Sequence, residues 1–570
     1  MQSCDLTKVG VRRTLVVLRP QFSNTSNDKV DLKMSKNLIL TIVAHQGYIR
    51  HENERNYALQ NDILFSAISQ TYLPLLNLFH KFEDEGIDFR LAMVLSPSLC
   101  ALLDDEIVKK QYVHWLEKQI ALGEKEIGRL LGDEALLKNA EDCLKKAKKD
   151  LLDFTQVYSE NLLKEFAYFS SRGNLELLAT SGTYAFLPHY GDMTEILNAQ
   201  VEVGLYSHRH YFGTNPDGFF LPFMGYTQGL EKVLRSYGFR YTIVDSRSIL
   251  FSDTMPEYGI FYPVRCDLDS DTALTQTSVA LFAQDSDTPS DITDEDFGFV
   301  SNPVYKNQEK DIAFELPSKN LIDAGFIETE SARIPSYFRY WSKKDDGNEI
   351  YDSILAKKQA EKDAETFFDV KKAKLDEAEK LMNGISPSLL CVLDAKILGQ
   401  SWAEGIDWLE AVIRKTCDSD ISLSVPSPLV KNPFSLQKIV PCPGAAQGNS
   451  YGEDLLDSTN GWMIRYTRKM SERMVDLSDR FPNETGLKVR LLNLGAKELM
   501  LAQSGEWATM IHDGIFPEYA KNRFEEAIKA FLIVFDALGS NTVSTEWLTR
   551  LEREHIIFPW MNFRMFSPKK

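Results

Sequence analysis

Short apolar runs that alternate with helical patterns are the feature that most constrains the fold of this 570-residue chain. Amphipathic segments such as 63–79 and 227–237 lie between runs of strand length. This alternation is typical of a parallel sheet whose outer faces are covered by helices. A closed barrel and an open doubly wound sheet both satisfy it. The expected strands include 38–44, 89–95, 175–180, 219–221, 241–245, 278–282 and 389–394.

Three stretches depart from the alternation and suggest how the chain is divided. Residues 104–169 are charged, lack proline and carry an apolar stripe at helical spacing, so we expect a helical hairpin inserted into a sheet domain that spans 34–415. Residues 283–345 are rich in Asp, Ser and Pro without a clear period, which predicts a loop or lid region beside a site. Prolines mark a linker at 416–445, and a C-terminal helical domain is expected at 446–570.

The N-terminus and the cysteines give expectations about processing and location. Residues 1–33 are polar and irregular, so we expect them to be disordered or untranslated, with Met34 as the true start. No apolar run approaches the ~18 residues that cross a bilayer, and no membrane association is expected. The seven cysteines are widely spaced and contain no Cys-x-x-Cys pair, which indicates reduced thiols and a cytoplasmic protein.

Charge and motif content narrow the classes of ligand. The net charge of -18 and the pI of about 5.1 argue against a nucleic-acid partner, because a phosphate backbone would be repelled. The basic run Lys145–Lys149 sits among acidic residues and is typical of a solvated helix face. No metal-ligand constellation and no nucleotide motif is found, so neither a metal nor a cofactor is expected. The sequence carries no signal of oligomeric state.

Polar residues stand where expected strands end. In parallel barrels, chemistry occurs at the carboxyl ends of the strands. His45 follows the first expected strand, whereas Asp245 and Asp394 end two later ones. Glu176 lies inside its strand. These positions make the four residues candidates for a cleft at one edge of the sheet.

Ordered motifs along the chain resemble one protein family. The first is Val43-Ala44-His45-Gln46-Gly47-Tyr48, and the last is Leu501-Ala502-Gln503-Ser504-Gly505-Glu506-Trp507. Between them lie Gly173–Leu177, Thr183–Pro188, Phe220–Tyr226, Leu393–Trp402 and Asn460–Trp462. In this order they resemble glycoside hydrolase family 57 of the 1,4-α-glucan branching type, from about Asn37 to Phe566.

The resemblance implies an incomplete (β/α)7 barrel with an inserted helical hairpin and a C-terminal α-helical domain. It also implies retaining glycosyl transfer on an α-glucan or maltooligosaccharide, which needs two carboxyl groups about 5–5.5 Å apart. Asp394 matches the family's acid/base. Phe223 stands where the family carries its nucleophilic glutamate. We therefore expect a cleft with weak or no catalysis.

Other family positions are also changed. Tyr184, Arg247 and Gln400 replace histidines, and Lys396 replaces a glutamate. Lys396 either forms an ion pair with Asp394 or leaves it free as an acid. The carboxylates that could replace the missing nucleophile are Glu176, Asp245, Glu404 and Glu506.

Substrate binding is expected to outlast catalysis. The resemblance and the strand ends assign binding roles to His45, Glu176, Tyr184, Asp245, Arg247, Trp402, Trp462 and Trp507. Tryptophans, including Trp408, stack on pyranose faces when exposed and belong to the core when buried. Three hypotheses stay open at this stage. The chain is a branching-type enzyme, a non-catalytic carbohydrate-binding or regulatory protein, or an interaction scaffold that uses the hairpin.

Overall fold

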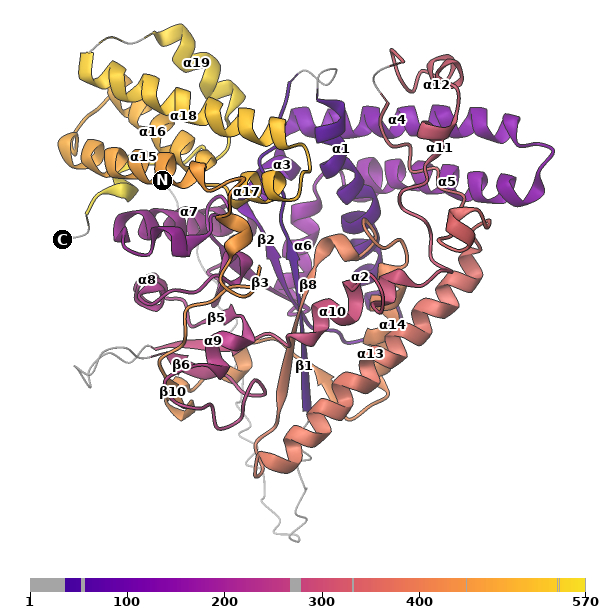
Figure 1. Ribbon diagram of the computed structural model, residues 1–570, viewed down its shortest axis with the longest axis horizontal. Helices are drawn as coiled ribbons and strands as arrows, with labels where there is room; N and C mark the ends of the chain where they lie inside the picture. Colours follow the sequence, from indigo (N-terminus) through magenta and orange to yellow (C-terminus); the bar gives the residue numbers. More distant parts are fainter. Residues whose placement is uncertain are drawn as a thin grey trace, which may run out of the picture. The chain divides into compact units, whose positions relative to one another are not determined.

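Seven parallel strands form the central ring of the computed structural model (Figure 1). The model describes residues 36–52, 57–266, 278–330, 333–446, 448–540, 542 and 544–568, so the expected leader and Met34 lie outside the described residues. The ring strands are β1 (Lys36–Ala44), β2 (Leu91–Leu95), β3 (Leu175–Thr180), β4 (Gly218–Phe220), β5 (Tyr241–Val244), β7 (Val279–Ala283) and β8 (Ser388–Asp394). Every expected strand is present, with ends that differ by one or two residues.

The strand pairing of the ring is extensive between β1 and β8 and minimal between β7 and β8. β1 pairs with β8 over seven residues, from Asn37 opposite Ser388 to Val43 opposite Asp394. Between β7 and β8 only a single bridge is made, by Gln284 and Leu390, and the Asp285 N–H donates to the Leu390 carbonyl at 2.7 Å. The predicted incomplete (β/α)7 barrel is confirmed.

Three short strands extend the sheet beyond the ring. β6 (Val264–Cys266) runs antiparallel to β7, and β10 (Lys438–Ile439) pairs with β6. β9 (Ile421–Leu423) pairs with β1. β9 and β10 lie in the stretch expected as a linker, and they attach it to the sheet. The division of the chain near this stretch stays a prediction, because Ser35–Lys570 groups as one compact unit.

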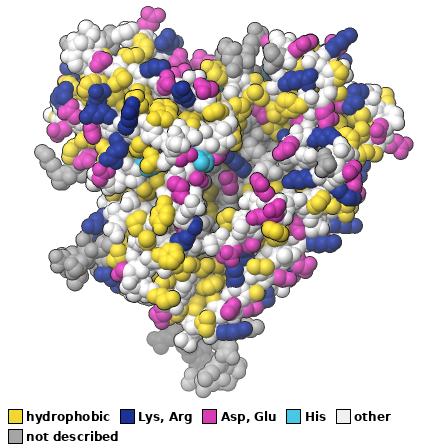
Figure 2. Space-filling view, in the orientation of Figure 1, with side chains coloured by type: hydrophobic (Ala, Val, Ile, Leu, Met, Phe, Trp, Pro, Cys, Tyr) yellow, Lys and Arg dark blue, Asp and Glu magenta, His cyan; other side chains and the backbone are white. Residues whose placement is uncertain are grey.

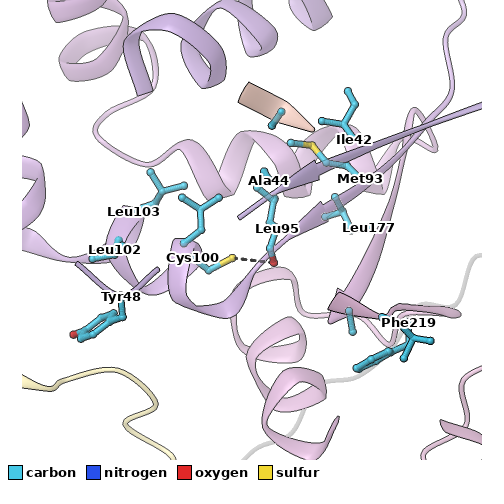
Figure 3. Close-up of a cluster of buried hydrophobic side chains, with 14 of the residues drawn as sticks. Ile42, Ala44, Tyr48, Met93, Leu95, Cys100, Leu102, Leu103, Leu177 and Phe219 are labelled. Carbon is cyan, nitrogen blue, oxygen red and sulfur yellow. Dashed lines mark hydrogen bonds between the residues drawn. The ribbon is translucent and has the colours of Figure 1, made fainter. Parts of the chain in front are cut away.

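Alternating side chains give the strands two apolar faces. Ile39 and Val43 of β1 point into the ring with Val94 of β2. Figure 3 shows the other face, where Ile42 and Met93 lie in a cluster of buried hydrophobic side chains. The same cluster includes Ala44, Leu95, Leu177 and Phe219 from the strands and Cys100, Leu102 and Leu103 from helix α3 (Pro97–Asp104).

Helices cover the outer face and complete the layers. Besides α3, the inserted hairpin and two short helices described below, the helices between the ring strands are α1 (Ala58–Ala67), α2 (Leu73–Glu85), α6 (Leu162–Ser171), α7 (Thr194–Phe212), α8 (Leu230–Ser236), α9 (Ser246–Leu250), α10 (Asp287–Thr293) and α13 (Ser353–Leu381). α1 passes into α2 through a π-helical turn, Ile68–Tyr72. α14 (Gly405–Cys417) follows β8 and packs along α13.

The inserted hairpin and the Asp/Ser/Pro-rich region share one small core. α4 (Glu106–Arg129) and α5 (Glu134–Leu152) lie side by side (Figure 1). The short helices α11 (Ile312–Glu315) and α12 (Ser318–Asp323) come from the later region. Their apolar residues pack with those of the hairpin in a cluster that contains Leu122, Ala140, Ile312, Leu321, Phe338 and Tyr340.

The C-terminal region is helical. Its helices are α15 (Trp462–Arg480), α16 (Leu487–Ala502), α17 (Gly505–His512), α18 (Pro517–Ser540) and α19 (Thr545–Glu554). In α18, Phe524, Phe531 and Leu538 of the predicted stripe are buried. No helix within the described ranges is long and apolar enough to cross a membrane. On the face shown in Figure 2, basic and acidic side chains are interspersed.

Candidate functional site

Three rings from three strand ends meet at the carboxyl edge of the barrel. His45 follows β1, Tyr184 follows β3 and Phe223 follows β4. The His45 and Tyr184 rings are stacked with centroids 4.0 Å apart, and the Phe223 ring meets Tyr184 edge-on at 5.1 Å. We call His45, Tyr184 and Phe223 the aromatic cluster. The structure therefore brings together three of the residues that the sequence predicted for the site.

The backbone at this edge is strained. Tyr184, Phe223 and Met224 have φ values of 53°, 57° and 51°. Residues other than glycine rarely adopt positive φ, and each such residue costs about 1–3 kcal/mol. The Phe223 carbonyl accepts a hydrogen bond from the Ala446 N–H at 2.8 Å, which holds the turn in place. Backbone strain of this kind is common at functional sites, where the surrounding structure holds the strained residue in one backbone conformation.

The Phe223 ring fits against a glycine. A Cβ added to Gly505, the first residue of α17, would lie 2.6 Å from Phe223 Cε2 and 2.9 Å from Phe223 Cζ. It would also lie 2.8 Å from the Tyr184 carbonyl oxygen. These distances are too short for any Cβ. Position 505 must therefore lack a side chain while the ring of Phe223 is present.

His45 links the cluster to an acidic residue of α17. Its Nε2 lies 3.1 Å from Glu506 Oε2, and its Nδ1 lies 3.0 Å from Ser96 Oγ. Burial acts to raise the pKa of Glu506, but the hydrogen bond with His45 and the charges of His45 and Lys396 outweigh it and hold this pKa at about 2. Glu506 is thus an ionised and paired carboxylate beside the aromatic cluster.

Asp394 and Lys396 lie near the aromatic cluster and Glu506. Asp394 ends β8, is exposed, and accepts the Lys396 N–H at 2.9 Å. Desolvation acts to lower the pKa of Lys396, but nearby carboxylates, Glu506 first and then Asp394 and Asp513, raise it. Burial raises the pKa of Tyr184, and the charge of Asp394 adds to this effect. In the described part of the chain no ion pair joins Lys396 to Asp394, so the carboxylate of Asp394 is not neutralised by direct pairing.

Glu176 does not lie at the aromatic cluster. It lies near the amino end of β3, where it accepts hydrogen bonds from the Tyr241 hydroxyl at 2.5 Å and from the Ser427 N–H at 3.2 Å. Burial raises its pKa. The carboxyl edge begins after Thr180, so Glu176 stands at the opposite end of its strand.

Asp245 and Arg247 form a unit at the end of β5. Asp245 is buried and accepts hydrogen bonds from the Arg247 backbone N–H at 3.0 Å, from the Arg247 Nε at 2.9 Å and from Gln284 Nε2 at 3.0 Å. The Arg247 side chain is 43% exposed. Its pKa is raised first by the hydrogen bond with Asp245, and the charges of Tyr451 and Glu453 contribute further. Asp245 therefore orients Arg247 and is itself fully engaged.

The predicted tryptophans differ in exposure. Trp402 is 1% exposed and packs against Trp408, and Trp507 is 2% exposed with its Nε1 donating to the Leu501 carbonyl at 2.7 Å. Neither Trp402 nor Trp507 presents a face on which a sugar could stack. Trp462 is half-buried, meets Phe524 edge-on and donates from Nε1 to the Thr459 carbonyl at 3.0 Å.

The remaining replacement carboxylate is also engaged. Glu404 is 2% exposed and accepts from the Tyr351 hydroxyl at 2.7 Å and from the Lys306 N–H at 3.2 Å. Sequence reasoning missed Ser96 and the packing role of Gly505. The signal for Ser96 was its place directly after the expected strand 89–95, and Gly505 stands where the family motif has serine.

Comparisons with known proteins agree with this architecture. The profile of glycosyl hydrolase family 57 matches residues 39–314, and that of the C-terminal region of 1,4-alpha-glucan branching enzymes matches residues 466–566. The 1,4-alpha-glucan branching enzyme TK1436 of Thermococcus kodakarensis is 24% identical over 512 residues, which cover 85% of this chain and 71% of that protein.

Solved structures extend the likeness over nearly the whole chain. The alpha-amylase AmyC of Thermotoga maritima has a TM-score of 0.84 and 29% identity, and the match covers 94% of this chain and 100% of AmyC. A branching enzyme of Pyrococcus horikoshii has a TM-score of 0.81 and 21% identity, and the match covers 95% of this chain and 98% of that enzyme. The fold, the edge that carries the site and the two matched profiles show that this chain belongs to glycosyl hydrolase family 57 and is of the branching-enzyme type.

Proposed function

We propose that this chain binds α-glucan in the cleft beside the aromatic cluster and forms no covalent glycosyl intermediate. The relatives named above act on this class of polymer: TK1436 is a 1,4-alpha-glucan branching enzyme and AmyC is an alpha-amylase. Family membership supports the substrate class. The presence of phenylalanine instead of glutamate at position 223 supports the absence of retaining chemistry.

The observation that carries the proposal is the packing of Phe223. A phenyl ring has no lone pair with which to attack an anomeric carbon. The ring lies between Tyr184 and Gly505, at the sequence position where the family resemblance expects the nucleophile. Loss of a nucleophile commonly lowers a rate by about 10⁴-fold or more.

Glu506 is a poor substitute for the lost glutamate. Its pKa of about 2 reflects stabilisation of the carboxylate by His45 and Lys396 after the opposing effect of burial. A carboxylate stabilised in this way is a weak base and a weak nucleophile. A replacement would also have to sit within about 0.5 Å of the productive position. Glu506 instead projects from α17 toward His45.

The remaining groups suit binding of a neutral sugar. Phe223 is half-buried, while Asp394 and Lys396 are exposed and offer an acceptor and donors for hydroxyl groups. Pyranose rings combine an apolar C–H face with hydroxyls that both donate and accept. A cleft with an aromatic surface and a few polar groups matches that chemistry.

Three measurements test the proposal together. Titration calorimetry with maltooligosaccharides should show binding, and incubation with amylose should change neither iodine staining nor the content of α-1,6 linkages. A mechanism-based fluorosugar should leave no adduct detectable by mass spectrometry. An active family 57 enzyme serves as positive control, and Phe223→Glu tests whether a carboxylate at this position restores labelling. An adduct on any Asp or Glu of the wild-type chain would contradict the proposal, and absence of binding would defeat its other half.

We also infer a cytoplasmic location and no nucleic-acid partner. Cys100, Cys143, Cys266, Cys391, Cys417 and Cys442 are free thiols, which fits a reducing compartment. The net charge of -18 opposes binding to a phosphate backbone. Fractionation of the native host cells, with labelling of the thiols before lysis, would test the location.

A further inference from the structure

Exposed apolar side chains gather where two distant segments of the chain run side by side. Residues 250–257 follow α9, and residues 433–440 contain β10. We call their exposed apolar side chains, Leu250, Phe251, Met255 and Phe434, the apolar patch; Met255 is 86% exposed and Phe251 is 70% exposed. Figure 2 shows hydrophobic side chains gathered in the lower part of this face, over the elements that Figure 1 labels α9, β6 and β10. Single exposed apolar side chains are common on soluble proteins, whereas a group of them marks a contact surface.

Hydrogen bonds between the two segments hold the patch in a fixed shape. The Asp253 N–H donates to the Val440 carbonyl at 3.2 Å, and the Val440 N–H donates to Asp253 Oδ1 at 2.7 Å. Gln437 Nε2 donates to the Met255 carbonyl at 2.9 Å, and Gln437 Oε1 accepts from the Glu257 N–H at 2.6 Å. A surface that is already ordered loses little conformational freedom when a partner binds. The exposed side chains between these hydrogen bonds therefore form a prepared surface.

The chemistry of the patch fits a protein partner better than a sugar. Its side chains are a leucine, a methionine and two phenylalanines, none of which has a polar edge. Tyrosine and tryptophan combine an apolar body with a polar group, which suits the mixed surface of a pyranose ring. Aromatic and methionine side chains are enriched in the centres of interfaces between proteins. The patch therefore resembles one half of a protein interface.

Charges of both signs flank the patch, and each sign keeps to its own segment. Exposed Asp253 and Glu257 lie on the first segment, and exposed Lys431 and Lys438 lie on either side of Phe434 on the second. A two-fold interface brings the same surface of two copies together, so that surface must complement itself. Separate acidic and basic sides meet this condition, since each faces its opposite after a two-fold rotation. The chain has a net charge of -18, so two copies repel one another over most of their surfaces, but much less at a balanced face.

We propose that the apolar patch is the interface of a homodimer, in which residues 250–257 of one copy lie over residues 431–438 of the other. Phe251 and Met255 form the apolar centre. Glu257 of each copy faces Lys431 of the partner subunit, so the contact occurs twice. The inference does not depend on glucan binding. Because Arg247 and Leu250 lie on the same short helix, α9, the second copy would border the end of β5.

Sedimentation of the full-length protein tests the dimer. The mass should approach twice 64.9 kDa as the concentration rises from about 1 to about 100 µM. Met255→Glu and Phe251→Ser should each raise the dissociation constant of the dimer about 100-fold, because each change acts twice in the interface. Phe297→Ser and Leu381→Glu, at positions that are 90% and 73% exposed elsewhere on the chain, are matched controls and should leave the dissociation constant unchanged. Circular dichroism checks that each variant is folded.

Charge reversal tests the two-fold arrangement. Glu257→Lys and Lys431→Glu should each weaken self-association about tenfold, because each places like charges opposite one another. An equimolar mixture of these two variants should associate as tightly as the wild type, since both contacts of the mixed dimer then pair opposite charges. A mixture that associates no more tightly than either variant alone would overturn the arrangement.

Other outcomes decide whether the patch is the interface. A wild-type protein that stays monomeric at about 100 µM would overturn the inference. A dimer that persists unchanged in Met255→Glu and Phe251→Ser would overturn the assignment to the patch. Calorimetry with maltooligosaccharides should give the same result for the wild type and Phe251→Ser, so failure of the proposed function leaves the dimer standing. Loss of sugar binding in Phe251→Ser, with a monomeric wild type, would show that the patch binds glucan instead.

Discussion

The contact between Phe223 and Gly505 makes a sharp prediction about Gly505→Ala. In most helices, replacing glycine by alanine stabilises the fold by up to about 1 kcal/mol, since alanine is the better helix former. Here the new methyl group would stand 2.6 Å from Phe223 Cε2 and 2.8 Å from the Tyr184 carbonyl oxygen. Both neighbours would have to move by several tenths of an ångström or more, and the carbonyl belongs to backbone that cannot yield easily.

The magnitude follows from these distances. Inserting a methyl group into a packed site costs about 1–3 kcal/mol. The gain in helix propensity is smaller than its usual value because Gly505 is the first residue of α17. We therefore expect Gly505→Ala to lower the free energy of unfolding by about 1–2 kcal/mol. In a Phe223→Ala background the ring contacts disappear and the Tyr184 contact remains, so the same change should be milder by about 1 kcal/mol.

A double-mutant cycle measures this coupling. The four proteins (wild type, Gly505→Ala, Phe223→Ala and the double variant) are unfolded in urea, with intrinsic fluorescence as the signal. Gly539→Ala, which meets open space in helix α18, is the matched control and should be neutral or stabilising. If Gly505→Ala changes the free energy of unfolding equally in both backgrounds, to within about 0.5 kcal/mol, contact with the Phe223 ring is not the reason why position 505 requires glycine.

Three further predictions concern buried charges. Burial raises the pKa of Asp62 to about 7, so the stability that this carboxyl contributes is complete below its unfolded pKa of about 4 and is lost as pH rises to 7. Asp62→Asn should therefore flatten the fall in unfolding free energy between pH 4 and 7, and an unchanged slope in that range would contradict this. Lys371 is fully buried and paired with Asp285 at 2.6 Å, whereas Lys374 gives Asp285 a second ion pair at 2.7 Å. Because Asp285 keeps that partner, Lys371→Met should lower the free energy of unfolding by about 1–3 kcal/mol, and a normal melting temperature would contradict this. Although burial opposes it, pairing with His45 holds the pKa of Glu506 at about 2, so its contribution is present above the unfolded pKa and lost as pH falls toward 2; thermal melts from pH 2 to 6 should be less pH-dependent in Glu506→Gln.

The sequence predicts the ring of strands well because each ring strand is an apolar run bounded by turn residues. β6, β9 and β10 were missed, since each is only two or three residues long and shows no period. The structure of the Asp/Ser/Pro-rich region could not be predicted from the sequence for another reason. Its apolar residues, such as Phe338 and Tyr340, find their partners on the hairpin about two hundred positions earlier. A local pattern cannot report a core whose two halves are so distant in sequence.

The sequence predicted the site residues whose positions follow from strand ends. It did not predict those whose exposure depends on packing between distant segments. His45, Tyr184 and Phe223 meet because parallel strands end at a common edge. Glu176 sits at the opposite end of β3, a distinction that depends on exact position along the strand. The burial of Trp402 follows from rings contributed by distant segments, which no residue pattern in its own segment records.

The packing at position 223 separates two explanations of a missing nucleophile. A site that had merely lost its carboxylate would leave a void or an unpaired charge where the glutamate had been. Here the Phe223 ring fills the space, Gly505 leaves room for it, and Glu506 is paired with His45. The strained turn at Phe223 and Met224 persists, although it costs about 1–3 kcal/mol per residue. Under the proposed function, the strained turn holds the shape of a glucan-binding site, and the half-buried Phe223 and the exposed Asp394 and Lys396 support that use.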